Sequence, residues 1–267
     1  MNRAGREDAP KYWAGAKVLQ VWQGQILASE NQVQLKVASD FSDADGKIYL
    51  GEVNTVHYFA IHKEIAEGSG QSLRDLAGHL NQELLEVCVT ALALVNWHES
   101  HPKCPKCGAD TVIDQNGWVR KCNVDGSQHF PRTDPAIIVA VQDRNGRLCL
   151  GRQSIWPEGR YSNFAGFVEP GENLEAAVLR EVEEESGLKV SDIKYLSSQP
   201  WPFPNSIMLA FEAFTDSPES AKPDGIEIED IKWFSREELR AAIKDGSLKL
   251  PPATSVSGKM IENWLNG

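Results

Sequence analysis

The sequence lacks a hydrophobic run long enough to cross a lipid bilayer. Its longest apolar run, Val87 to Trp97, falls short of the roughly 20 residues that a membrane-spanning helix requires. The N-terminal residues contain no apolar core like that of a signal peptide, and the C-terminal residues form no peroxisomal address. These absences predict a cytoplasmic protein that does not bind membranes.

Positive charge and cysteine are also scarce. The 267 residues include 27 lysines and arginines against 38 aspartates and glutamates, which gives a net charge of −11. Such an acidic chain binds nucleic acid poorly by charge alone, and it needs metal cations to handle phosphates. Of the 5 cysteines, Cys88 and Cys149 lie in apolar stretches and are expected to be buried thiols.

The sequence does contain a distinctive acidic stretch from Gly166 to Leu188, GFVEPGENLEAAVLREVEEESGL. Asn173 is suited to cap the start of a helix, and Gly187 is suited to end it. Between them, apolar residues recur at helical spacing, at Leu174, Ala177, Val178 and Val182. The stretch therefore predicts a loop followed by a helix that packs one side against a core.

Glu181, Glu184 and Glu185 would lie on one face of that helix, because residues three and four positions apart are neighbours on a helix surface. Crowded carboxylates repel each other unless a cation lies between them. The cluster therefore predicts a Mg²⁺ or Mn²⁺ site and a phosphate-containing substrate. The alternative is a solvated acidic face, which is the usual meaning of a glutamate run.

The whole stretch resembles the Nudix box, G-x5-E-x7-R-E-U-x-E-E-x-G-U with U apolar, and every fixed position matches. The resemblance implies a Nudix hydrolase, which cleaves a nucleoside diphosphate linked to another group. It also implies that Glu181, Glu184 and Glu185 bind the metal together with the backbone carbonyl of Ala165. Either Glu184 or Glu185 would be the general base, and Arg180 would orient the glutamates by ion pairing.

A further metal-binding glutamate of the Nudix family precedes a tryptophan on a strand. Glu227, before Trp233, fits this position best, and Glu229 and Asp230 are its rivals. Any of these acids would otherwise be an ordinary solvated side chain.

Cys104, Cys107 and Cys122 have the spacing of a zinc ribbon, and Asp125 stands where a fourth thiolate belongs. Three outcomes are open. Asp125 completes a structural Zn²⁺ site, His129 completes it instead, or the segment folds without metal.

A second motif, SQPWPFPNS from Ser198 to Ser206, follows the Nudix box. Alone, its prolines and aromatic residues would indicate a stiff surface loop. In this position it resembles the distinguishing motif of the NADH pyrophosphatase family. The resemblance covers essentially the whole chain and is weakest in its N-terminal part. Asp125 departs from the family, which usually has cysteine there.

This resemblance implies hydrolysis of NAD(H) to NMN(H) and AMP by a homodimer whose subunits share their sites. Some relatives remove the NAD cap from RNA by the same bond cleavage, so NAD-capped RNA is a second expected substrate. One alternative is a Nudix hydrolase for another dinucleotide, such as ADP-ribose or FAD. The other is a nucleotide-sensing module without activity, although that class often loses the glutamates that are intact here.

The segments predict an α+β protein in three parts. These are a small α+β domain over residues 1–98 with a helix over 80–97, a zinc-ribbon-like segment over 99–131, and a Nudix domain over 132–267. The resemblance implies that the Nudix domain is an α/β/α sandwich with a mixed sheet. In it, Asn145-Gly146 predicts a hairpin between two apolar strands, and helices are expected over 236–243 and 255–265.

Several residues are candidates for binding the substrate. Phe167 is the first choice to stack on the nicotinamide, unless it is a core residue, and Phe130 resembles an aromatic that reaches the partner subunit's site. Ile138 and Ser257 are weaker candidates. Arg74 either resembles a substrate-binding arginine or forms an exposed ion pair. The second motif supplies Gln199, Pro200, Trp201, Pro202, Phe203, Pro204, Asn205 and Ser206.

Overall fold

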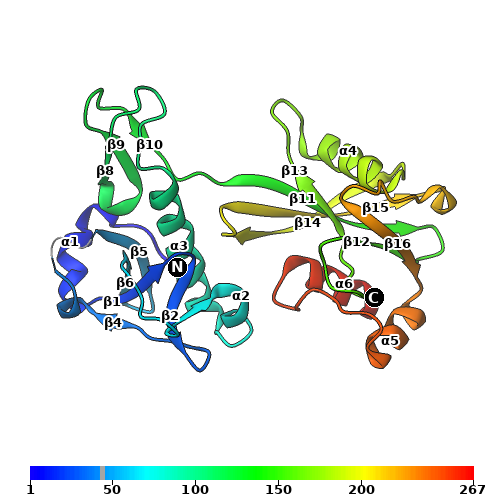
Figure 1. Ribbon diagram of the computed structural model, residues 1–267, viewed down its shortest axis with the longest axis horizontal. Coiled ribbons are helices and arrows are strands. Elements are labelled where there is room, and N and C mark those ends of the chain that lie inside the picture. Colours follow the sequence, from blue (N-terminus) through cyan, green and yellow to red (C-terminus); the bar gives the residue numbers. More distant parts are fainter. Residues whose placement is uncertain (43–45) are drawn as a thin grey trace. The chain divides into compact units, whose positions relative to one another are not determined.

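The computed structural model describes residues 1–42 and 46–267. They form two compact units, Met1–Thr133 with Trp201–Asn205 and Asp134–Pro200 with Ser206–Gly267 (Figure 1). The cysteine-bearing segment lies within the first unit, and the three-part division of the sequence stays a prediction. None of the helices in the described ranges is both long and apolar enough to span a bilayer.

The first unit is built on a mixed sheet with the strand order β3-β2-β1-β6-β5, to which β4 and β7 add through β1 and β2. Strands β1 and β6 are parallel, and β5 and β6 form an antiparallel pair. The strands are β1 Lys17–Trp22, β2 Gln25–Ser29, β3 Gln32–Val33, β4 Lys36–Val37, β5 Lys47–Val53, β6 Val56–His62 and β7 Gly70–Ser72.

Helix α3, Gln82–Ser100, packs on this sheet and confirms the helix predicted over 80–97 (Figure 1). Its buried Val87, Ala91 and Leu92 share a core with strand residues such as Leu19. A second core, which includes Val18, Tyr49 and Phe59, is packed against the short helix α1, Ala9–Tyr12. Alternate residues of β1 thus enter different cores, as the twofold periodicity of a strand requires.

A small antiparallel sheet of the first unit carries the ribbon cysteines. It consists of β8 Thr111–Asp114, β9 Val119–Cys122 and β10 Gln128–His129, in the order β10-β9-β8. Cys104 and Cys122 are each 2% exposed.

A buried arginine joins this small sheet to α3. Arg120 donates to Thr111 Oγ1 over 2.6 Å and to the Thr111 carbonyl over 2.9 Å. Its Nη1 lies 3.1 Å from His98 Nδ1, and His98 Nε2 lies 2.9 Å from the Gly117 carbonyl. A guanidinium only donates and a carbonyl only accepts, so His98 is neutral and carries its proton on Nε2.

The second unit contains a six-stranded sheet with the order β14-β15-β11-β12-β16, and β13 pairs with β11. Strands β11 and β15 are parallel, whereas β12, β13 and β16 pair antiparallel with their neighbours. The strands are β11 Asp134–Asp143, β12 Leu148–Gln153, β13 Phe164–Phe167, β14 Ser191–Trp201, β15 Ser206–Thr215 and β16 Ile228–Phe234.

Helices cover both faces of this sheet. Helix α4, Leu174–Ser186, lies on one face, and α5, Arg236–Asp245, and α6, Val256–Asn266, lie on the other (Figure 1). The second unit is therefore an α/β/α sandwich with a mixed sheet, which confirms the predicted fold class. The helices predicted over 236–243 and 255–265 are α5 and α6.

Strand β11 lies inside the sheet and is apolar on both sides. Ile137, Val139 and Val141 enter the core beneath α4, while Ile138 and Ala140 enter the core beneath α6. This explains why the strand has a continuous apolar sequence rather than an alternating one.

The hairpin predicted at Asn145-Gly146 joins β11 to β12. The Asp143 carboxylate, 1% exposed, accepts the backbone N–H groups of Asn145 and Arg147 at 2.9 and 2.8 Å. Gly146 has a φ of 78°, which glycine adopts without strain.

His98 makes the stability of the first unit depend on pH. Burial, assisted by the charge of Arg120, lowers the pKa of His98 to about 4. Between that value and the unfolded pKa of about 6.5, the unfolded chain binds a proton that the folded chain does not. The contribution of His98 to the free energy of unfolding is therefore fully present above about pH 6.5. It falls by up to about 3 kcal/mol as the pH decreases towards 4.

We expect His98→Gln to flatten this dependence, measured as the urea midpoint of unfolding over a pH series. The exposed His79→Gln is the matched control and should keep the slope of the unaltered protein. An unchanged slope in His98→Gln would contradict the assignment to His98.

Candidate active site

The loop and helix predicted from Gly166 to Leu188 are present. The Asn173 side chain accepts the Ala176 N–H over 2.8 Å at the start of α4, and Gly187 ends the helix with a φ of 67°. Ala177, Val178 and Val182 are buried in the core beneath the helix. Glu183 and Glu184 lie on the exposed side of α4, whereas Glu185 follows Val178 and Val182 at helical spacing and is buried.

Helix α4 approaches β13 closely at Gly166. A side-chain carbon at this position would overlap the Glu181 carboxylate, so the glycine makes room for that group. The neighbouring Ala165 N–H lies 3.3 Å from Glu185 Oε2. The backbone of β13 and two glutamates of α4 therefore meet, and the metal site with the Ala165 carbonyl as a ligand stays a prediction.

Arg180 holds the acidic residues in place. Its guanidinium lies 2.5 Å from Glu172 Oε1, 2.8 Å from Glu181 Oε1 and 3.0 Å from Glu184 Oε2. It also donates to the Phe167 carbonyl over 2.9 Å. The hydrogen bond to Glu172 is the main cause that raises the pKa of Arg180, and Arg180 in turn lowers the pKa of Glu172. The sequence analysis gave no role to Glu172, although it is a fixed position of the box.

Glu185 is the most buried acid of the cluster. Only 3% of it is exposed, and burial, with the charge of Glu181 adding to it, raises its pKa to about 8. Burial also raises the pKa of Glu181. A buried carboxylate with acidic neighbours is costly to ionise, and a cation bound among these groups would remove that cost.

Glu227 is favoured over its two rivals by the electrostatics of the site. Its charge is among the causes that raise the pKa of both Glu181 and Glu185. Glu229 instead pairs with Arg152 at 2.7 Å. Asp230 accepts from the Tyr161 hydroxyl and lies 3.5 Å from Lys232 Nζ.

Asp224 is a residue of the site that the sequence analysis missed. Its carboxylate accepts the Glu227 N–H over 3.1 Å and the Ile228 N–H over 2.8 Å. Its charge also contributes to the raised pKa of Glu185. The signal in the sequence was Asp224-Gly225, a dipeptide typical of turns, which here shapes the loop that carries Glu227.

The candidates for binding the substrate have different environments. Phe167 and Phe130 are 58% and 64% exposed, so neither is a core residue. Ile138, 4% exposed, packs in the core beneath α6. Ser257, 5% exposed, lies 2.8 Å from Ser162 Oγ and accepts from the Asn163 amide over 3.0 Å.

The second motif divides between the two compact units. Gln199 belongs to the second unit and binds the start of α6, donating to the Thr254 carbonyl over 2.8 Å and accepting the Val256 N–H over 2.7 Å. Trp201–Asn205 belongs to the first unit. There the Asn96 amide donates to the carbonyls of Pro202 and Pro204 at 3.2 and 3.4 Å.

Arg74 lies over the aromatic residues of the second motif. Its guanidinium carbon is 4.5 Å from the Phe203 ring centre and 5.6 Å from that of Trp201. The two rings pack edge to face, 4.9 Å apart. Arg74 thus makes cation–π contacts rather than the ion pair that was considered from the sequence.

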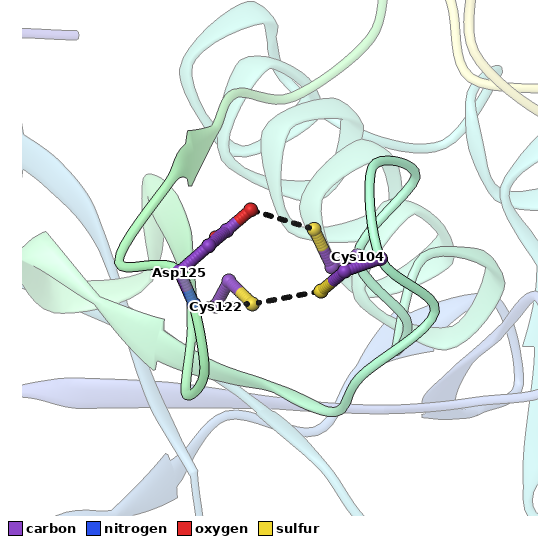
Figure 2. A group of neighbouring side chains, drawn as sticks. Cys104, Cys122 and Asp125 are labelled. Atoms are coloured by element: carbon purple, nitrogen blue, oxygen red, sulfur yellow. Dashed lines mark hydrogen bonds between the residues drawn. The ribbon is translucent and has the colours of Figure 1, made fainter.

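The ribbon cysteines form a separate cluster with Asp125. One ligand atom from each of Cys104, Cys107, Cys122 and Asp125 lies within 4.8 Å of every other. Figure 2 shows the carboxylate of Asp125 facing the thiol of Cys104, at 3.9 Å. Cys107 Sγ and Cys122 Sγ are 3.5 Å apart.

Asp125 is better placed than His129 to be the fourth ligand. Ser127 donates to Asp125 Oδ1 through its hydroxyl at 2.6 Å and its N–H at 2.8 Å, and these bonds lower the pKa of Asp125. The carboxylate is therefore charged and oriented. His129 Nε2 instead lies 3.1 Å from Ser127 Oγ.

Comparison with known proteins gives concordant results. Residues 132–254 match the NUDIX domain, and residues 15–97 match the NADH pyrophosphatase-like rudimentary NUDIX domain. A crystal structure of a NUDIX hydrolase from Nitrosomonas europaea has a TM-score of 0.44 at 19% identity, over 55% of this chain and 96% of that one.

Two curated relatives are more similar in sequence. The NAD-capped RNA hydrolase NudC of Mycobacterium bovis is 36% identical over 98% of this chain and 90% of its own length. The human NAD-capped RNA hydrolase NUDT12 is 38% identical over 70% of this chain and 43% of its own length. On this identity and coverage, the chain belongs to the Nudix hydrolase family, in the branch that also carries a NADH pyrophosphatase-like domain.

Proposed function

We propose that the protein hydrolyses the pyrophosphate bond of NAD(H) to give NMN(H) and AMP. We also propose that the same cleavage removes the cap of NAD-capped RNA, which releases NMN and leaves a 5′-monophosphate on the RNA. The observation that carries this proposal is the acidic cluster on α4, with Glu185 buried against the backbone of β13. The names of the two relatives and the SQPWPFPNS motif support NAD as the substrate.

Mg²⁺ or Mn²⁺ fits the acidic cluster, because such hard cations prefer oxygen ligands. The carboxylates of Glu181, Glu184, Glu185 and Glu227 and the carbonyl of Ala165 would hold the metal. When bound, the metal neutralises the pyrophosphate and makes water a better nucleophile. The raised pKa values of Glu181 and Glu185 support this proposal, because they show carboxylates gathered without enough positive charge.

Arg180 and one glutamate would carry the remaining roles. Arg180 keeps Glu181 and Glu184 in fixed rotamers through its ion pairs and fixes the loop through the Phe167 carbonyl. Either Glu184 or Glu185 accepts the proton of the attacking water at its carboxylate. Glu184 is mainly exposed, whereas Glu185 is buried.

The aromatic residues would hold the dinucleotide. The exposed ring of Phe167 lies next to the acidic cluster in the sequence and provides a flat face for the nicotinamide. The residues Gln199 to Ser206 would line the substrate site. Phe130, 64% exposed, would reach the site of the partner subunit in a homodimer.

The ribbon cluster would hold a structural Zn²⁺ through Cys104, Cys107, Cys122 and Asp125. Three thiolates and a carboxylate form an acceptable zinc ligand set, and the close approach of all four side chains supports it. Asp125, rather than His129, would complete the site.

Glu185→Gln should lower the turnover of NADH by about 100-fold or more, because it removes a charge that serves the metal or the proton transfer. The measurement is chromatography of NMNH formed from NADH with Mg²⁺, run beside ADP-ribose, FAD and NAD-capped RNA. Glu183→Gln, on the exposed side of α4, is the matched control and should remain active. Near-normal turnover in Glu185→Gln, or no NMNH from the unaltered protein, would refute the proposal.

Gly166→Ala should weaken Mn²⁺ binding by about tenfold or more, because the added carbon displaces the Glu181 carboxylate. Free Mn²⁺ is measured by electron paramagnetic resonance in a titration. Gly78→Ala is the control, since a side-chain carbon there meets nothing within 4 Å. Equal Mn²⁺ affinity in both variants would show that Glu181 is not a ligand.

Protein purified without chelator should contain about one zinc per chain, measured by plasma mass spectrometry. Asp125→Ala should lose most of this zinc, whereas His129→Ala should keep it, because His129 contacts Ser127. The reverse order would make His129 the fourth ligand. A zinc content far below one per chain in the unaltered protein would exclude the zinc site.

A further inference from the structure

The first unit contains a pocket that the proposed reaction does not use. Its volume is about 640 Å³, within the range of pockets that hold small molecules. The polar side chains in its lining belong to Arg3, Arg6, Glu7, Gln115 and Asn116. They come from the N-terminal segment and from the short 3₁₀ turn Gln115–Gly117 between β8 and β9.

Two arginines of this pocket are held against one indole ring. The guanidinium carbons of Arg6 and Arg3 lie 4.1 and 5.3 Å from the ring centre of Trp118. Trp118 is fixed in turn, because its Nε1 donates to the Tyr49 carbonyl over 2.7 Å. The Asn116 amide donates to the Arg6 carbonyl over 2.8 Å and ties the N-terminal segment to the turn.

The pocket lining contains two guanidinium groups and one carboxylate, that of Glu7. Neither Arg3 nor Arg6 forms an ion pair with a residue in the described ranges, and Arg3 instead donates to Thr90 Oγ1 over 3.2 Å. The nearby Glu86 carboxylate is engaged by the amino group of Met1 at 3.0 Å. Burial and the charge of Arg6 lower the pKa of Arg3, and the charge of Glu86 acts in the opposite direction. Two guanidinium groups on one indole ring repel each other, and an anion bound to both would reduce the repulsion.

The turn that faces the arginines has an uncommon backbone. Gln115, Asn116 and Gly117 follow one another with φ values of 46°, 53° and 98°. A side-chain carbon on Gly117 would overlap Ile48, so the turn is pressed against β5. Left-handed backbone at residues other than glycine is costly, and it persists where the surrounding structure imposes it. Here it places two amide side chains in the lining of a pocket that already holds two guanidinium groups.

We propose that this pocket binds a phosphate group. Guanidinium groups donate paired hydrogen bonds to phosphate oxygens, and the amides of Gln115 and Asn116 add further donors. The pocket is larger than a single phosphate ion needs, so it also has room for the group to which the phosphate is attached. The ligand is therefore either free inorganic phosphate or a phosphate carried by a nucleotide or an RNA chain.

The test follows the indole N–H signal of Trp118 in ¹H–¹⁵N NMR spectra of the full chain, identified by its loss in Trp118→Phe. Inorganic phosphate, AMP and a short 5′-phosphorylated oligouridylate are titrated separately, with chelator present to prevent turnover. We expect a saturable shift with at least one of them. Saturation by inorganic phosphate identifies the free ion as sufficient, whereas saturation by AMP or the oligonucleotide alone identifies a phosphate ester.

Arg6→Gln should weaken the responding ligand by about tenfold, since a charge-assisted hydrogen bond is lost. Lys121→Gln removes an exposed positive charge from β9 of the same unit and should leave the affinity unchanged. Thermal unfolding of each variant shows that it is folded, and Arg6→Lys, which keeps the charge without the paired donors, should give an intermediate affinity. No saturable shift with any of the three probes, or equal affinities for Arg6→Gln and Lys121→Gln, would overturn the proposal.

Discussion

The arrangement of the acidic cluster depends on the guanidinium of Arg180. This one group binds Glu172 from the loop, Glu181 and Glu184 from α4, and the Phe167 carbonyl at the end of β13. Carboxylates brought this close would otherwise repel each other and turn towards solvent. With Arg180 among them, the helix and the preceding loop keep one geometry, and Gly166 allows Glu181 to lie against the strand. Arg180 forms no ion pair with Glu185, and Glu185 has no other basic partner among the described residues. This buried carboxylate would therefore be stabilised by a cation bound beside it.

Local patterns in the sequence predicted the parts of this site that depend on neighbouring residues. Helix α4 begins after Asn173 and ends at Gly187 as expected, and the Asn145-Gly146 hairpin joins the two apolar strands. These features were predictable because caps and turns depend on the residues that form them. Contacts between distant segments could not be predicted in this way. The cation–π packing of Arg74 on Phe203, the donation from Asn96 to Pro202, and the ion pair of Glu229 with Arg152 are contacts between segments far apart in the sequence.

The ribbon segment is stabilised by two arrangements that act at different places. At one end, Cys104, Cys107, Cys122 and Asp125 converge on a common centre. At the other, Arg120 joins Thr111 to His98 of α3 through buried hydrogen bonds. The second arrangement needs no metal, and it explains how β8 and β9 stay attached to the helix. A carboxylate in place of the usual thiolate is therefore compatible with the ribbon, because buried hydrogen bonds also hold the segment to α3.

The acidic cluster and the arginine pocket follow the same electrostatic principle with opposite signs. In each, like charges lie close enough to shift each other's pKa, Glu181 with Glu185 in one unit and Arg3 with Arg6 in the other. In a chain with a net charge of −11, acidic residues often lie together by chance. The glutamates of α4 indicate a site only because the Nudix box is complete and Arg180 pairs with them. Composition explains the arginine pocket less easily, since the chain has 38 acidic residues to pair with 27 basic ones. Arg3 and Arg6 nevertheless stack on one indole and form no ion pair in the described ranges. Like charges gathered in one place are therefore the stronger indication of a ligand when their sign is opposite to the net charge of the chain.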